Sequence, residues 1–480
     1  MIGYIFSAVL ALSPVLQGAF DLPLQLAFQR AVLAGCLAWL FLGLRTRGFS
    51  AGLYEKRFYP LWAAAALSFA SLIASPFRGS IFNEWGNYGA GLLIFVFGSF
   101  LDAEERARVV RALLWGAWLV FGLSLLEAYV LGNLGSAPPL TNLNALALYC
   151  VMIIPAALEF RMWPLAGAMA ILMIWTRSAG AALAALTAAG FYAAERFKGR
   201  EFRENAWLLA VLGAVAVGAG LYLLQADSVT GRLAWWKSAF EMFRLRPLQG
   251  FGHASYTWAQ AMFQGRGVFR EHAIYAHNYY LEFLAENGLP AALAWFWLLF
   301  AAARERNGLI KYSVIAALAH SFVDFGLSVP ANFWVFCFLL SSPAEAAGVK
   351  PARGAAARAL GLTLLLAAAL LSLDLRSLGF ERARGRALAA AAAGSPERAE
   401  AELRPALGSK LFRAPALEFL GRLNMAMPGG GFRAAAFYEE ALLENRYSAP
   451  AWRSLEKIYS VPGHERDAAG LERRRLGVCK

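Results

Sequence analysis

The sequence predicts an all-α membrane protein, a polytopic transmembrane helical bundle followed by a separate helical domain. Of its 480 residues, 59% are hydrophobic and only 16% are charged, a combination that soluble domains of this size rarely show. Apolar runs recur along residues 1–373, and most approach the roughly 20 residues that a helix needs to cross the hydrocarbon core. The charged, alanine-rich remainder, residues 374–480, is expected to be soluble.

Roughly thirteen spans, or twelve if one short run is discounted, are expected from these runs. They are residues 3–19, 25–44, 59–76, 87–101, 110–131, 142–159, 163–176, 178–194, 206–224, 279–303, 309–327, 329–345 and 356–373. The first run has no basic leader and no small-residue cleavage signal before Asp21. We therefore expect it to be a helix and not a signal peptide.

The net charge of +13 is explained by membrane orientation. If the N-terminus is cytoplasmic, most arginines and lysines between the spans fall on inner loops, and the short outer loops hold little beyond Arg78 and Arg177. Such a bias sets the orientation of a membrane protein. We expect a multi-pass protein of the inner membrane, with no nucleic-acid partner.

Two segments interrupt the short loops. Residues 225–277 form an outer loop far longer than ordinary connections, which predicts a functional role. In the tail, small and aromatic residues follow the spacing of a tetratricopeptide (TPR) repeat; they are Ala436, Tyr438, Ala441, Leu442, Pro450, Ala451, Leu455 and Tyr459. The alternative is a generic helical hairpin. An odd number of spans places the tail, a possible site for a protein partner, on the same side as the outer loop.

No metal or cofactor is expected. The four cysteines are scattered without a C-x-x-C pair, so they indicate neither a disulfide framework nor a metal site. A zinc site of His253, His272 and His277 is disfavoured, because the spacing fits no compact ligand pattern. P-loop, Rossmann and Ser-His-Asp signatures are absent from the sequence.

Two arginines are candidates for binding an anion. Arg177 lies at the outer junction of two apolar runs, where it either extends to the lipid headgroups or binds a phosphate or diphosphate in bidentate fashion. Arg232 begins an amphipathic helix in the outer loop, where its charge opposes the helix dipole. The apolar face of that helix is expected to comprise Leu233, Trp236, Phe240 and Phe243.

The outer-loop helix is followed by Arg244 and Arg246, which we interpret as interfacial charges, and then by Pro247, Gly250 and Gly252, which predict a tight turn.

The stretch "HNYYLEFLAENGLPAA" at 277–292 opens the next span with polar groups. Asn278, Glu282 and Glu286 share one helical face at i, i+4 and i+8. His277 is either structural or a proton acceptor for a hydroxyl nucleophile, since imidazole titrates near neutral pH. His320 and Asp324, at i and i+4 of a later span, form either a plain ion pair or a pair that orients catalytic groups.

The order of these motifs resembles the O-antigen ligase and polymerase superfamily. T-R-S is followed by G-R-x-x-x-W, R-P-L-x-G-x-G, A-H-N-x-Y-L-x-x-x-x-E-x-G and H-S-x-x-D-F, over about residues 140–340. The resemblance implies a metal-independent, inverting glycosyltransferase that takes a glycan from a polyprenyl (undecaprenyl) diphosphate carrier. One departure lies after the glutamate, where the family often has G-x-x-G and this chain has Gly288, Leu289, Pro290 and Ala291.

The resemblance also implies roles for the residues. Arg177 and Arg232 would stabilise the leaving diphosphate, and His277 would accept the proton of the incoming hydroxyl or orient it. The remaining candidates for the substrate site are Asn278, Glu282, Glu286, Arg246, His320 and Asp324. The acceptor could be lipid A core in a ligase, another glycan in a polymerase, or a protein hydroxyl in an oligosaccharyltransferase. A transporter of lipid-linked saccharide is the alternative outside enzymes, although charges clustered at the outer face favour an enzyme.

Overall fold

The computed structural model describes residues 1–45, 56–132, 139–197, 228–263, 273–343, 355–461 and 463–478. This part of the chain consists of helices and turns and contains no strand, so the predicted all-α class is confirmed. The expected span 206–224 lies outside the described residues, as do His272 and Cys479.

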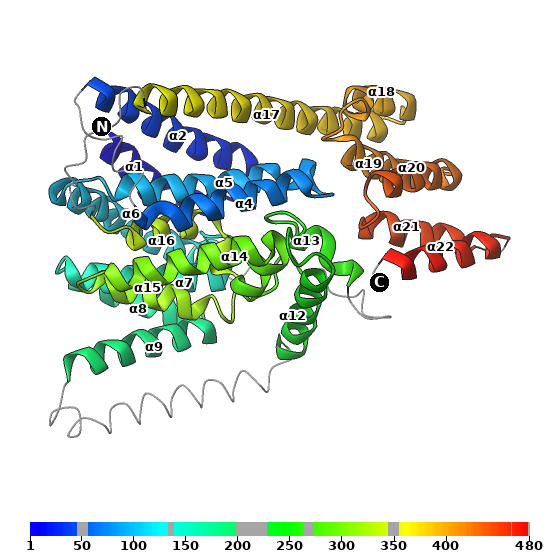
Figure 1. Cartoon of the computed structure of the whole chain (residues 1–480). Coiled ribbons are helices and arrows are strands. Elements are labelled where there is room, and N and C mark those ends of the chain that lie inside the picture. Colours follow the sequence, from blue (N-terminus) through cyan, green and yellow to red (C-terminus); the bar gives the residue numbers. More distant parts are fainter. Residues whose placement is uncertain are drawn as a thin grey trace.

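The helical bundle occupies the left of Figure 1, where most of its helices run roughly parallel to one another. It comprises α1 (Ile2–Leu12), α2 (Leu22–Arg45), α4 (Tyr59–Ala74), α5 (Arg78–Gly98), α6 (Ala103–Tyr129), α7 (Leu143–Glu159), α8 (Trp163–Trp175), α9 (Ala179–Arg196), α14 (Tyr279–Glu305), α15 (Ile310–His320) and α16 (Pro330–Leu340). Short 3₁₀ turns are η1 (Gln17–Ala19), η2 (Lys56–Phe58) and η4 (Gly326–Ser328).

Four helical segments are long and apolar enough to cross a membrane: Leu22–Leu42, Lys56–Ala74, Ala103–Tyr129 and Tyr279–Glu305. Five further apolar helices have 10–17 residues, which is shorter than an isolated span requires. One of these, α16, is buried over its whole length. The described residues thus form a multi-pass helical membrane protein, and the number of thirteen spans stays a prediction.

The outer loop contains the expected helix, α12 (Ser228–Leu245), followed by α13 (Tyr256–Ala259) and η3 (Gln260–Met262). In Figure 1, α12 lies crosswise to the bundle helices at one end of the bundle, which we call the loop end. Leu233 and Phe240 of the predicted apolar face are 57% and 50% exposed, whereas Ala239 and Met242 of the same helix are buried. A face in contact with the membrane surface stays a prediction.

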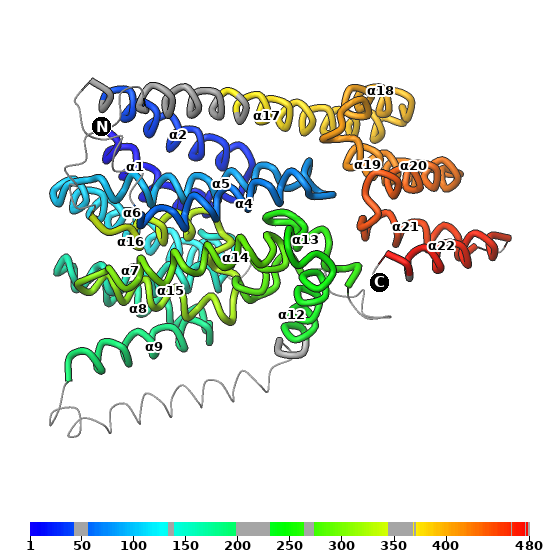
Figure 2. The backbone as a smooth tube through the Cα atoms, viewed as in Figure 1, coloured from blue at the N-terminus to red at the C-terminus, as the bar shows by residue number. Residues whose placement is uncertain are grey.

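The tail begins within a long helix, α17 (Ala355–Ala392), which runs beside α2 in Figure 2. The expected domain boundary at Asp374 therefore falls inside a helix, where the carboxylate is buried and pairs with Arg30 of α2. The remaining tail helices are α18 (Pro396–Leu407), α19 (Arg413–Met425), α20 (Gly431–Glu444), α21 (Ala449–Tyr459) and α22 (Glu465–Val478). They lie at the loop end (Figure 1). TPR-like character stays a prediction for them.

The tail helices pack through small residues. Gly421 of α19 lies directly against the ring of Tyr438 in α20, where a side chain carbon would come within 2.7 Å of the ring. Ala441, Ala451 and Leu455 are fully buried in the same cluster, together with Ala261 and Met262 of the outer loop. These contacts join the tail to the outer loop.

Candidate functional site

The start of α14 is fixed by an N-cap. The side-chain oxygen of Asn278 accepts hydrogen bonds from the backbone N–H groups of Tyr280 and Leu281, at 3.1 and 3.0 Å, as N-cap residues do. The Tyr279 N–H donates to the carbonyl of Ser321 at 2.9 Å, which joins α14 to the end of α15. Asn278 therefore holds the helix start, and its side-chain oxygen is engaged by backbone.

His277 precedes this cap with a backbone φ of +51°, a left-handed conformation that is uncommon for residues other than glycine and that often occurs at functional sites. Its ring stacks on Trp235 of α12 at 4.7 Å between centroids and contacts the edge of Phe325 at 4.8 Å. The side chain is 19% exposed. The two aromatic contacts hold the imidazole in one orientation while part of it stays accessible.

Asp324 joins two of the predicted catalytic residues. One carboxylate oxygen lies 3.4 Å from Nδ1 of His277, and the other lies 3.5 Å from a guanidinium nitrogen of Arg232. The Asp324 side chain is only 1% exposed, and buried charges are normally paired. The outer-loop helix α12 thus brings Arg232 to the junction of α14 and α15.

The predicted ion pair between His320 and Asp324 is wrong, because Asp324 pairs with His277 and Arg232 instead. The helix α15 ends at His320, and Asp324 lies in the turn that follows. His320 is fully buried, and within the described residues its ring nitrogens have no hydrogen-bond partner.

Glu282 and Glu286 bind the backbone of the outer loop. Glu282 accepts from the N–H of Ala276 at 2.6 Å and from the Ser328 hydroxyl at 2.9 Å. Glu286 accepts from the N–H groups of Ala254 and Tyr256, at 2.8 and 2.9 Å. The two carboxylates therefore anchor the middle and the end of the outer loop to one face of α14, and Glu282 binds the loop directly before His277.

The R-P-L-x-G-x-G turn packs on a break in α14. Gly288 has φ +78° and ψ 168°, so the helix is interrupted there and backbone groups on both sides become available. The Gly252 N–H donates to the carbonyl of Glu286 at 2.7 Å, and the Leu289 N–H donates to the carbonyl of Pro247 at 2.8 Å. A side-chain carbon on Gly250 or Gly288 would lie 2.1 or 2.4 Å from the opposing backbone. Only glycine therefore fits at these two positions.

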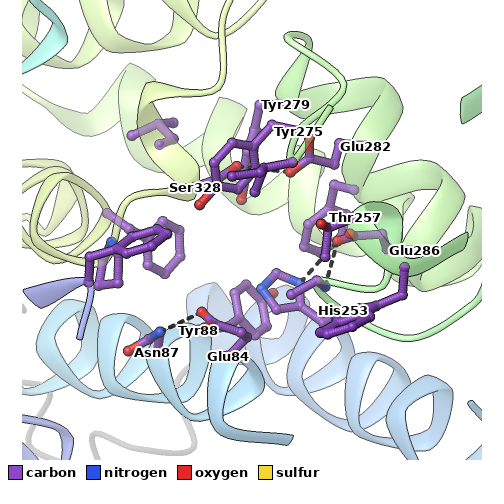
Figure 3. A pocket seen from close by; sticks show the side chains of 18 of the residues that line it. Glu84, Asn87, Tyr88, His253, Thr257, Tyr275, Tyr279, Glu282, Glu286 and Ser328 are labelled. Atoms are coloured by element: carbon purple, nitrogen blue, oxygen red, sulfur yellow. Dashed lines mark hydrogen bonds and ion pairs between the residues drawn. The ribbon is translucent and has the colours of Figure 1, made fainter. Parts of the chain in front are cut away.

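A cavity of about 200 Å³ lies beside the anchored loop. Figure 3 shows Glu84 and Tyr88 of α5 on one side of it and Tyr279 and Glu282 of α14 on the other. Its lining includes neither His277 nor the arginines 177 and 232. Tyr275, which lines the cavity, stacks on Phe325 at 4.5 Å, and Phe325 in turn contacts the His277 ring at 4.8 Å.

His253 and Glu84 line this cavity, and the sequence interpretation did not predict either of them as a residue of the functional site. Burial lowers the pKa of His253, a loop residue, from 6.5 to about 4, so its ring is neutral at physiological pH. Glu84 lies in the polar first part of α5, close to Asn83 and Asn87 and before the apolar run 87–101, so the apolar pattern did not single it out.

The other two predicted arginines lie apart from His277. Arg177 is exposed, with φ +52°, just before α9. That helix packs on the end of α15, because a carbon added to Gly180 would lie 3.2 Å from Val323, the residue before Asp324. Arg246 instead donates to the carbonyl of Ala74 at 3.2 Å and lies over the Phe251 ring.

The matched family segment covers most of this site. None of the curated proteins matches the chain. A family model described as O-antigen ligase matches residues 164–296, which include Arg177, Arg232 and His277 but end before Asp324. Residues 164–296 are thus similar to the O-antigen ligase family, and this similarity, together with the helical fold of the described residues, supports the expected O-antigen ligase-like superfamily.

Proposed function

We propose that this protein transfers a glycan from a polyprenyl diphosphate carrier to an acceptor hydroxyl at the loop end of the bundle. The observation that carries the proposal is the position of Asp324 between His277 and Arg232. One carboxylate thereby holds a candidate base and a candidate anion-binding group within one site. Glycan transfer needs both a base for the acceptor hydroxyl and a group that binds the leaving diphosphate.

His277 is suited to accept a proton. A carboxylate near Nδ1 favours the tautomer with its proton on that nitrogen, which leaves Nε2 as the acceptor. The acceptor oxygen would attack the anomeric carbon while its proton passes to Nε2, and the bond from that carbon to the diphosphate oxygen would break. Attack from the opposite face inverts the anomeric configuration, and the electron pair leaves with the carrier diphosphate.

Arg232 is suited to hold that diphosphate. One of its nitrogens lies 3.5 Å from Asp324, and the side chain is 17% exposed, so guanidinium N–H groups directed away from the carboxylate would donate to phosphate oxygens in the bidentate geometry that arginine favours. Arg177, at the exposed turn before α9, would supply a second guanidinium. Donors placed where negative charge develops are typically the largest contribution to such catalysis.

The polyprenyl chain would lie in the bilayer, which the proposed site adjoins through the start of the candidate span Tyr279–Glu305. We place the site on the periplasmic side of the inner membrane. The candidate acceptors remain lipid A core, another glycan and a protein hydroxyl. A transporter is less well supported, because transport alone does not require a carboxylate-held imidazole beside a partly exposed arginine.

The direct test is transfer by the purified full chain in detergent or nanodiscs. Labelled undecaprenyl diphosphate glycan would be supplied with each acceptor class, and product and released carrier would be measured together. Transfer to one acceptor with inverted linkage is the expected result. The proposal would be contradicted by carrier binding without any product. It would also be contradicted if the glycan were released from the carrier only by hydrolysis, with no transfer to an acceptor.

Lysine variants test the division of roles. Arg177→Lys and Arg232→Lys should bind carrier more weakly and transfer more slowly, because a point charge cannot reproduce the bidentate fork. Arg382→Lys, an exposed tail residue, is the control. If both lysine variants behave as the control does, the guanidinium groups do not hold the diphosphate.

A further inference from the structure

A second and larger cavity, of about 530 Å³, lies at the loop end between the bundle and the tail. Three arginines from separate parts of the chain line it: Arg78 at the start of α5, Arg246 after α12, and Arg446 between α20 and α21. Neither the family match nor the proposed transfer reaction uses this cavity, and Arg446 lies well outside the matched residues 164–296.

The arginine side chains are held in place by neighbouring groups. Arg446 donates to the Tyr447 hydroxyl at 2.7 Å, and Arg246 donates to the carbonyl of Ala74 at 3.2 Å while lying over the Phe251 ring. Tyr447 in turn meets Phe251 edge to face at 5.0 Å. The tail and the outer loop therefore position two guanidinium groups through one aromatic pair.

The cavity has a positive charge that its own residues do not balance. Glu444 is the one acidic residue among the described lining residues, and it already pairs with Arg413 at 3.0 Å. Burial lowers the pKa of Arg246, and the nearby charge of Arg446 lowers it further. An anion in the cavity would relieve this repulsion.

The surroundings of the cavity are apolar on the side of the bundle. Ala74, which lines the cavity, is the last residue of the candidate membrane span Lys56–Ala74. Beside it Ile73 is 58% exposed, and Leu248 and Leu443 are 72% and 86% exposed. A cationic cavity at the end of a span, bordered by exposed aliphatic side chains, matches the headgroup level of a bilayer.

We propose that Arg78, Arg246 and Arg446 bind the phosphate of an anionic membrane lipid, whose acyl chains contact the exposed leucines. The lipid would then hold the tail against the membrane surface and, through the Tyr447–Phe251 contact, support the outer loop. Arginine suits this role because its planar fork donates to two phosphate oxygens at once. Basic groups near the membrane surface favour the binding of anionic lipid.

The test uses the delipidated full chain with phosphatidylglycerol, phosphatidylcholine or inorganic phosphate, and lipid retention is measured by native mass spectrometry. The wild type should retain phosphatidylglycerol at least tenfold more tightly than phosphatidylcholine. The variant Arg78→Gln/Arg246→Gln/Arg446→Gln should lose this preference. The control Arg382→Gln/Arg398→Gln/Arg466→Gln removes the same charge from exposed tail positions outside the cavity and should retain it.

A single substitution guards against misfolding in the triple variant. Leu443 is 86% exposed, so Leu443→Asp should fold normally and weaken phosphatidylglycerol binding several-fold. Equal retention by the triple variant and its control would overturn the proposal. The proposal would also be overturned if inorganic phosphate bound as tightly as the lipid, because the cavity would then be a site for free phosphate.

Discussion

Buried carboxylates at two places differ in how their charges are satisfied. Glu282 and Glu286 lie on the first turns of α14, and Asp324 lies after the end of α15. Each oxygen of Glu282 and Glu286 accepts a hydrogen bond from the outer loop or from Ser328. Asp324 instead faces two cationic side chains at 3.4 and 3.5 Å, which are longer than good charge-assisted hydrogen bonds. The glutamates are thus committed to structure, whereas the aspartate holds groups that can still bind a substrate.

The comparison teaches that burial of charge does not by itself identify a catalytic site. A carboxylate whose oxygens are bonded to backbone N–H groups stabilises a loop, and its loss should lower stability first. A carboxylate that orients a partly exposed imidazole should affect rate first. Transfer rate and thermal unfolding, measured on the same purified variant, separate these two outcomes.

The largest effect is expected at His277. His277→Ala should lower turnover by about 10²–10⁴, the usual contribution of a general base, while carrier binding and thermal stability change little. His464→Ala in the tail, where the ring pairs with Asp467, is the matched control. A His277→Ala protein that folds normally and transfers glycan at the wild-type rate would show that the histidine is structural.

Asp324 should act through His277 and Arg232. Asp324→Asn should lower turnover roughly 10–100-fold, as loss of an orienting carboxylate does elsewhere, because the amide no longer fixes the imidazole tautomer. An unchanged turnover with a reduced melting temperature would assign Asp324 to stability alone.

Glu286 should show the opposite pattern. Glu286→Leu leaves the N–H groups of Ala254 and Tyr256 without their acceptor, and each unsatisfied buried group costs about 1–3 kcal/mol. The unfolding temperature should therefore fall clearly, and turnover per folded molecule should fall less than in Asp324→Asn. If Glu286→Leu is as stable as the wild type yet inactive, the glutamate belongs to the reaction.

The close approach of the outer-loop turn to the break in α14 can be tested by substituting Gly288. Gly288→Ala places a carbon 2.4 Å from the Leu248 carbonyl oxygen at a φ of +78°, and the strain should destabilise the protein by roughly 1–3 kcal/mol. Gly122→Ala in α6 meets nothing within 4 Å and should be neutral or stabilising by about 0.5–1 kcal/mol. Equal stability of the two variants would mean that the turn does not depend on this close approach.

The smallest effect is expected from His253 and depends on pH. Its pKa is about 4 in the folded chain because burial opposes the charge, whereas an unfolded histidine titrates near 6.5. Between these two pH values the unfolded state binds more protons than the folded state. The contribution of His253 to stability is therefore complete above about pH 6.5 and falls as the pH decreases toward 4. His253→Gln should weaken this pH dependence, and an unchanged profile would assign it to other groups.

The sequence by itself determined the class of the molecule and most of the residues that meet in the site. Long apolar runs have few stable alternatives to helices in a bilayer, because backbone groups there must be bonded internally. Two polar residues retained at the ends of such runs, His277 and Asp324, stood out because their burial is costly. The motif order then predicted the family, which the match to residues 164–296 supports.

Only the tertiary structure decided how these residues are paired. Helical periodicity placed Asp324 with His320, but α15 ends at His320 and the turn brings the carboxylate to His277 and Arg232. Similarly, Glu282 and Glu286 looked like groups for a substrate until the loop backbone was found bound to them. Local spacing shows which residues share a helical face, whereas the partner of a buried charge depends on which distant segment packs against that face.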